Sequence, residues 1–137
     1  MALGPLNGTV AASAQSLGVA TNVPYGFTVF IRSTGPFSSP SGSIADVPFL
    51  NIAPGPFPLS GEAFGYTTND LSLNTASPTR FFDNGAMWSA LTTTNAEVAT
   101  GTAGNNEQCV AIQARAGSTT KAGNYKTTVV YSVTPTF

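Results

Sequence analysis

The chain contains no histidine and only one cysteine, Cys109, among its 137 residues. Six acidic and five basic side chains make up 8% of the sequence, against about 25% charged residues in an ordinary soluble protein. Histidine is the side chain most often used in acid–base catalysis, and metal centres draw mainly on histidine, cysteine and clustered carboxylates. The composition therefore predicts a protein that is not an enzyme and that carries no cofactor.

Positive charge is also scarce, since the net charge is −1 and the five basic residues are dispersed. Proteins that bind nucleic acid neutralise phosphates with a concentrated basic surface, so we expect no nucleic-acid partner. No stretch approaches the ~20 apolar residues of a membrane span, and we expect no membrane insertion. A low net charge weakens repulsion between identical chains, so the partner that the composition favours is a copy of itself.

The amino terminus, Met1 to Pro5, lacks the basic region and the apolar run of a signal peptide. The whole chain is rich in Thr, Ser, Asn, Gly and Ala and poor in Lys and Glu, a composition typical of secreted proteins. We therefore expect an extracellular or cell-surface protein whose signal peptide has been removed. If Met1 is the native start, the expected location is a virion. Cys109 has no partner for an intrachain disulfide, so the redox compartment stays open.

Apolar and polar residues alternate with period two along the chain, and no long window shows a helical period. The alternation is cleanest at residues 25–32, 108–114 and 125–134, and weaker strands are predicted at 6–12, 65–68, 79–82, 87–91 and 97–100. In the first two strong strands, one face carries Phe27, Val29, Ile31, Val110, Ile112 and Ala114. Asn84-Gly85 is a strong hairpin signal, because a type I′ turn needs positive φ at both central positions.

The C-terminal strand shows the strongest pattern, and β-branched and aromatic residues dominate it, as a half-buried strand requires. Its expected shared face carries Tyr125, Thr127, Val129, Tyr131 and Val133. Residues 35–61 differ, since they hold six prolines, which remove donors from a strand ladder. Apolar residues between these prolines favour a long ordered connection with an edge strand near Val47–Ile52. The chain is thus predicted to be all-β, with residues 1–137 forming a single Ig-like or jelly-roll-type antiparallel β-sandwich domain.

The segment Lys121 to Phe137 combines Ala-Gly-x-Tyr, alternating Thr and Val, and an aromatic end. It resembles the closing strand of secreted bacterial surface β-modules, in particular spore-coat-U-type and archaic chaperone–usher pilin subunits. The resemblance covers about the last quarter of the chain, which departs from spore-coat-U-type pilins in having no second cysteine. It implies an Ig-like sandwich used structurally.

In that pilin group, an N-terminal strand from one subunit fills the open groove of its neighbour, which satisfies the unpaired main-chain groups of an edge. Residues 1–13 would be the donated or exchanged strand here, with Leu6, Thr9, Val10 and Ala12 as the assembly residues. The alternative is an ordinary first strand in its own sheet.

The resulting functional hypothesis is a structural subunit of an extracellular filament, pilus or surface layer, assembled by strand or edge exchange between copies. A second hypothesis is a carbohydrate-binding or adhesion module, with surface glycans as partners and Tyr66, Trp88 and the proline-rich connection as the platform. Trp88 also fits a core position, since aromatic residues dominate sandwich cores. A third hypothesis is a virus capsid or decoration protein.

Oxygen donors for Ca²⁺ are the one candidate metal set, formed by Asp70, Asp83 and Asn84. The alternative is that these residues serve turns, where Asp and Asn are favoured for backbone reasons.

Overall fold

The computed structural model describes residues 10–73, 80–82 and 86–137. In chain order the strands are β1 (Val10–Thr21), β2 (Phe27–Ser33), β3 (Ser38–Ser39), β4 (Gly42–Ser43), β5 (Gly55–Pro56), β6 (Ala63–Thr68), β7 (Met87–Trp88), β8 (Ala96–Gly101), β9 (Gly104–Arg115) and β10 (Val129–Pro135). The described part of the chain contains no helix, and so none that is long and apolar enough to cross a membrane.

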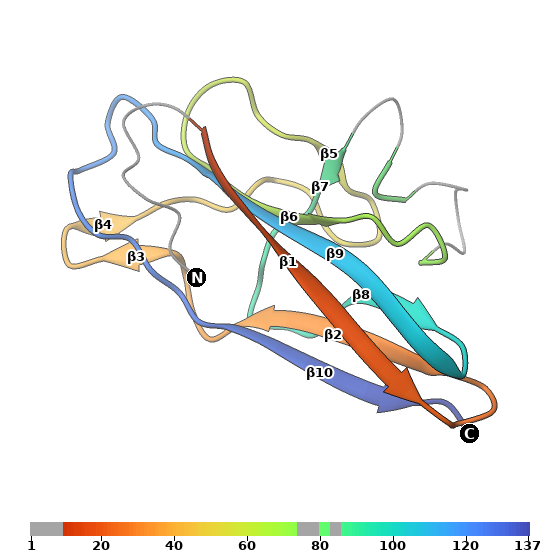
Figure 1. The fold of residues 1–137 in the computed structure, drawn as a ribbon. Helices are drawn as coiled ribbons and strands as arrows, with labels where there is room; N and C mark the ends of the chain where they lie inside the picture. Colours follow the sequence, from red (N-terminus) through yellow and green to blue (C-terminus); the bar gives the residue numbers. More distant parts are fainter. Residues whose placement is uncertain (1–9, 74–79, 83–85) are drawn as a thin grey trace.

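Two three-stranded antiparallel sheets form the two main layers, with strand orders β1-β9-β6 and β10-β2-β8 (Figure 1). The first described strand pairs with β9 along its whole length, from Val10 opposite Arg115 to Thr21 opposite Gly104. Two short antiparallel pairs, β3-β4 and β5-β7, lie outside these sheets. The predicted all-β, antiparallel character is thereby confirmed.

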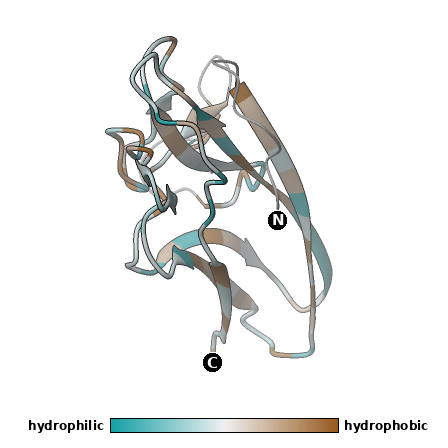
Figure 2. Cartoon of the chain, turned by 90° about the vertical axis from the view of Figure 1, so that its left-hand side faces the viewer, coloured by the Kyte–Doolittle hydropathy of each residue, from teal (hydrophilic) through white to brown (hydrophobic). Residues whose placement is uncertain are grey.

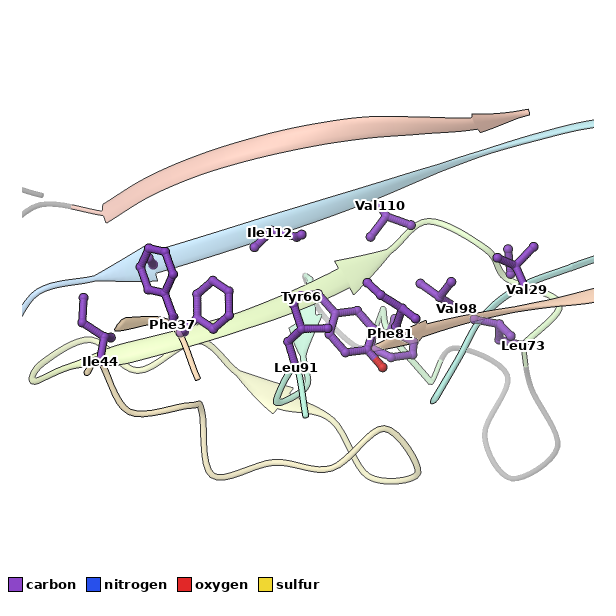
Figure 3. Packing of buried hydrophobic residues seen from close by; sticks show 14 of the residues in the cluster. Val29, Phe37, Ile44, Tyr66, Leu73, Phe81, Leu91, Val98, Val110 and Ile112 are labelled. Atoms are coloured by element: carbon purple, nitrogen blue, oxygen red, sulfur yellow. The ribbon is translucent and has the colours of Figure 1, made fainter. Parts of the chain in front are cut away.

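The main core lies between the two sheets. The faces predicted for the first two strong strands are buried: Phe27, Val29 and Ile31 of β2 and Val110, Ile112 and Ala114 of β9. The face predicted for the C-terminal strand is only partly buried, and its Val133 is exposed. Figure 3 shows side chains from both sheets converging on this interior, among them Val29, Tyr66, Val98, Val110 and Ile112. Hydrophobic and hydrophilic stretches both occur along the long strands in Figure 2.

A second, smaller cluster lies on the other face of the β1-β9-β6 sheet. It is formed by Val47, Ala63 and Trp88, with Phe49 and Phe57 packed against it. All six residues of β6 are buried because one face meets the main core and the other meets this cluster. The proline-rich connection supplies three members of the second cluster, Val47, Phe49 and Phe57, and so packs against the β1-β9-β6 sheet.

The edge strand predicted near Val47–Ile52 is not formed. In its place, the Val47 N–H donates to the Phe64 carbonyl at 2.8 Å, and a turn follows in which the Ala53 N–H donates to the Leu50 carbonyl at 2.9 Å. Pro48 and Pro54 flank this turn. Because proline has no N–H, the segment makes single bridges instead of a continuous ladder.

Strand ends differ from the sequence prediction in several places. The strand predicted at 108–114 begins at Gly104, the one predicted at 87–91 ends at Trp88, and no strand forms over the described residues 80–82 of the one predicted at 79–82. The strand predicted at 6–12 overlaps β1 at residues 10–12, and β1 continues to Thr21, while residues 6–9 lie outside the described residues. The closing strand was predicted from Tyr125 but begins at Val129, although Lys126 bridges to Ser38. The predicted turn at Asp83, Asn84 and Gly85 lies outside the described residues.

Candidate functional site

The two main sheets each have two edge strands, and these edges differ in how their outer main-chain groups are satisfied. We call the outer sides of β6 and β8 the closed edge and the outer sides of β1 and β10 the open edge. Across the two layers β6 contacts β8, and Tyr131 of β10 is hydrogen-bonded to Gln15 of β1, so β6 and β8 lie at one end of the two sheets and β1 and β10 at the other. The closed edge is covered by loops of the same chain, as the following contacts show.

Loop main chain covers the outer side of β6. Phe64 accepts from the Val47 N–H at 2.8 Å. Tyr66 and Ser89 exchange two main-chain hydrogen bonds of 2.9 Å each. Gly65 lies between these contacts, and a Cβ at this position would be 2.7 Å from the Ser89 carbonyl oxygen. The loops therefore approach β6 as closely as a further strand would.

Side chains cover the outer side of β8. The Asn51 amide donates to the Glu97 carbonyl at 2.7 Å, and the Thr100 N–H donates to a carboxylate oxygen of Asp70 at 2.5 Å. Asp70 is buried and also accepts from the Ser72 N–H and hydroxyl at 2.8 and 2.5 Å. The Asp70 carboxylate thus accepts the hydrogen bond from the Thr100 main-chain N–H that a carbonyl of a neighbouring strand would otherwise accept.

The candidate calcium donors are only partly described. The Asp70 carboxylate accepts hydrogen bonds from the Ser72 and Thr100 N–H groups of its own chain, as a turn residue does. Asp83 and Asn84 lie outside the described residues. In the part of the chain that is described, no group of three or more Cys, Asp or Glu side chains gathers where it could hold a metal ion.

In the part of the chain that the structure describes, no main-chain hydrogen bond covers the open edge in this way. Within residues 10–73, 80–82 and 86–137, β1 pairs only with β9 and β10 pairs only with β2. A side-chain hydrogen bond links the two strands, because the Tyr131 hydroxyl donates to the side-chain amide oxygen of Gln15 at 2.7 Å. Burial raises the pKa of Tyr131 to about 12, so the hydroxyl keeps its proton for this bond over the neutral pH range.

The core is incompletely covered along this edge. Val133 is the cross-strand partner of Val29 and so faces the same side, yet Val133 is 53% exposed and Val29 is 1% exposed. On β1, Leu17 and Val19 are half-buried and pack against the main core. An apolar seam formed by Leu17, Val19, Tyr131 and Val133 therefore lies at the surface between the two sheets.

The chemistry of the open edge lacks the usual protections. Neither β1 nor β10 contains a charged residue, and their one proline is Pro135, the last residue of β10. Natural proteins commonly guard edge strands with charged side chains, prolines, bulges or short length. The 12-residue strand β1 is long, uncharged and free of proline.

The predicted assembly residues are distributed as follows. Val10 and Ala12 lie in β1 and pair with Arg115 and Gln113 of their own β9, which is the arrangement of an ordinary first strand. Leu6 and Thr9 lie outside the described residues. In the closing strand, Val129, Tyr131 and Val133 share the core-facing side of β10. Tyr125 precedes the strand and packs against Phe37 with ring centroids 5.9 Å apart.

The predicted ligand platform is not formed as an exposed surface. Tyr66 is fully buried in the main core, and Trp88 is buried in the second cluster with its ring 5.2 Å from that of Phe57. The two rings are on opposite faces of one sheet, so they do not meet. A shallow depression of about 540 Å³ lies elsewhere, beside Pro36, Pro40 and Lys126, and no aromatic side chain lines it.

Sequence reasoning missed the seam residues Leu17 and Val19 and the edge-covering residue Asn51. Leu17 and Val19 are separated by Gly18 and preceded by Ser and Ala, so their segment has weak strand propensity. Asn51 lies between Leu50 and Ile52 in the turn, and nothing in its local sequence indicates a contact with two distant strands.

Comparison of the chain with protein-family models, with curated proteins and with solved structures finds no match.

Proposed function

We propose that this chain is a non-catalytic structural subunit of an extracellular filament, pilus or surface layer, whose copies join through the open edge formed by β1 and β10. The observation that carries the proposal is the contrast between the two edges of one molecule. The closed edge is covered by Val47, Ser89, Asn51 and Asp70, while the described residues provide no main-chain partner for the open edge.

An uncovered edge strand offers a row of unpaired N–H and C=O groups, which a strand or loop from another chain can satisfy. The adjoining apolar seam adds a hydrophobic contribution to any such contact, since burying apolar surface is worth about 25 cal/mol per Å². The absence of charge along both strands removes like-charge repulsion between approaching copies.

The form of exchange that the structure supports differs from a freely donated N-terminal strand. Because Val10 and Ala12 already pair with β9, donation of residues 1–13 would require the start of β1 to leave its own sheet. Addition of a neighbour along the open edge needs no such step. The two facing sheets also support the Ig-like or jelly-roll-type assignment, and the pilin-like C-terminal segment belongs to the open edge as β10.

The structure bears differently on the two other hypotheses, a glycan-binding module and a capsid or decoration protein. A glycan-binding module would need exposed aromatic rings, whereas Tyr66 and Trp88 are buried. A capsid or decoration protein would use the same open edge for contacts between copies, so it shares the proposed interface and differs in location.

The test is the particle state of the purified chain, measured by light scattering and negative-stain microscopy over a range of concentrations. We expect the wild type to self-associate and Val133→Lys to self-associate at least about tenfold more weakly, because the new charge lies on the apolar seam. Thr134→Lys is the matched control, since it adds the same charge to the exposed neighbouring residue, whose side chain projects from the opposite face. A wild type that stays monomeric at all concentrations would overturn the proposal.

A further inference from the structure

A turn at the closed edge holds two large aliphatic side chains in solvent. The Ala53 N–H donates to the Leu50 carbonyl at 2.9 Å and closes the turn. Leu50 is 61% exposed and Ile52 is 76% exposed. Exposed apolar side chains are common singly, but here two flank one polar residue at the tip of an ordered loop.

The residue between them fixes the turn to both layers. The Asn51 amide nitrogen donates to the Tyr66 hydroxyl at 2.6 Å and to the Glu97 carbonyl at 2.7 Å. Tyr66 belongs to β6 and is fully buried, while Glu97 belongs to β8. Both N–H groups of the Asn51 amide thus hold the turn in place. Because the turn is already ordered, binding through Leu50 and Ile52 would lose little conformational entropy.

The turn and the open edge lie at opposite ends of the sheets. The strands that anchor Asn51 are the closed-edge strands β6 and β8, and the apolar seam belongs to β1 and β10. We call Leu50 and Ile52 the apolar knob. A knob at one end of the molecule and an apolar seam at the other can form the two halves of a head-to-tail contact. Such a heterologous contact produces an open chain of subunits unless its rotation happens to close a ring.

We propose that Leu50 and Ile52 of one copy pack against the seam of Leu17, Val19, Tyr131 and Val133 in the next copy. This inference rests on the proposed function and names the surface that occupies the open edge. A second copy is the occupant favoured by the charges, because Pro48 to Gly61 contains no charged residue and neither does β1 or β10. An uncharged apolar knob matches an uncharged apolar seam.

The experiment uses two single variants and their mixture, with sedimentation and light scattering as readouts. Ile52→Lys places a charge on the apolar surface of the turn and leaves the open edge unchanged. Val133→Lys places a charge on the apolar seam and leaves the turn unchanged. We expect each variant alone to weaken self-association about tenfold or more, as loss of a central apolar contact does. An equimolar mixture should form heterodimers that grow no further, because only one intact interface can form between the two variants.

Leu59→Lys is the control for the turn, since Leu59 is 89% exposed on the same connection but outside the turn. It should associate like the wild type, and circular dichroism should show all variants folded. If Ile52→Lys associates like the wild type while Val133→Lys does not, the inference is wrong although the proposed function stands. A mixture without heterodimers would likewise overturn the inference, because an edge-to-edge contact between identical surfaces predicts that result.

Discussion

At the scale of single residues, Asp70 shows how a carboxylate can replace a missing strand. Its two oxygens accept the main-chain N–H groups of Ser72 and Thr100, and the side chain is 5% exposed. A buried N–H that loses its acceptor costs about 1–3 kcal/mol. The role of Asp70 is therefore to terminate β8 on its outer side without another strand.

We expect Asp70→Ala to lower the free energy of unfolding by about 2 kcal/mol, because the Thr100 N–H would be left without its acceptor. Urea denaturation monitored by circular dichroism measures this change. Glu107→Ala is the control, since the exposed Glu107 carboxylate accepts only a side-chain bond from Ser16, and its loss should cost at most about 0.5 kcal/mol. Equal losses for both variants would contradict the role assigned to Asp70.

Tyr131 makes the open edge sensitive to alkaline pH. Burial raises the pKa of its hydroxyl to about 12, whereas an unfolded tyrosine ionises near pH 10. Between these values the unfolded chain has lost the proton that the folded chain keeps, so the free energy of unfolding falls as pH rises from about 10 to about 12. Below pH 10 the contribution is fully present.

Tyr131→Phe should remove this part of the alkaline destabilisation, as measured by urea denaturation at pH 9 and pH 11. Tyr25→Phe is the control, because Tyr25 is 74% exposed and should leave the alkaline fall in place. An unchanged difference between the two pH values in Tyr131→Phe would show that another group is responsible.

At the scale of elements, β6 is confined on both faces and β1 is free on one. The contrast is visible in two glycines, Gly65 in β6 and Gly18 in β1. A Cβ at Gly65 would lie 2.7 Å from the Ser89 oxygen and 2.9 Å from a methyl group of Val47, while a Cβ at Gly18 would meet nothing within 4 Å.

Gly65→Ala should therefore destabilise the protein by about 1–3 kcal/mol through overpacking. Gly18→Ala should be neutral or stabilise it by up to about 1 kcal/mol, because alanine restricts the unfolded chain. Thermal melting of the two variants compares them directly. If Gly65→Ala is as stable as the wild type, the loops that carry Val47 and Ser89 can move away from the added methyl group at little cost in free energy.

The alternation of apolar residues predicted the elements whose packing is local and regular. Phe27, Val29 and Ile31 fall on one face of β2 because a strand places every second side chain on the same side. The same pattern could not locate the end of β1, whose alanines, serines and glycine carry little contrast in hydropathy. It also could not predict the two contacts of Asn51, which depend on the fold bringing β6 and β8 beside one turn.

At the scale of the whole molecule, charge is nearly absent from both candidate contact surfaces. Ionic contacts between exposed groups weaken as salt screens them, whereas apolar contacts do not. We expect the dissociation constant for self-association to change less than about twofold when NaCl is raised from about 0.05 to about 0.5 M. Sedimentation at both salt concentrations measures it, and a large loss of assembly in high salt would show that charged residues form the interface.

The pairing of β1 with β9 has a consequence for the time course of folding. Val10 lies opposite Arg115, so β1 pairs with a strand that is synthesised much later than β1 itself. Pairing between distant segments is slow because the intervening loop must first close. During synthesis β1 therefore has no partner strand of its own until β9 has been made, and in that interval the β9 strand of a neighbouring chain is the one available to it.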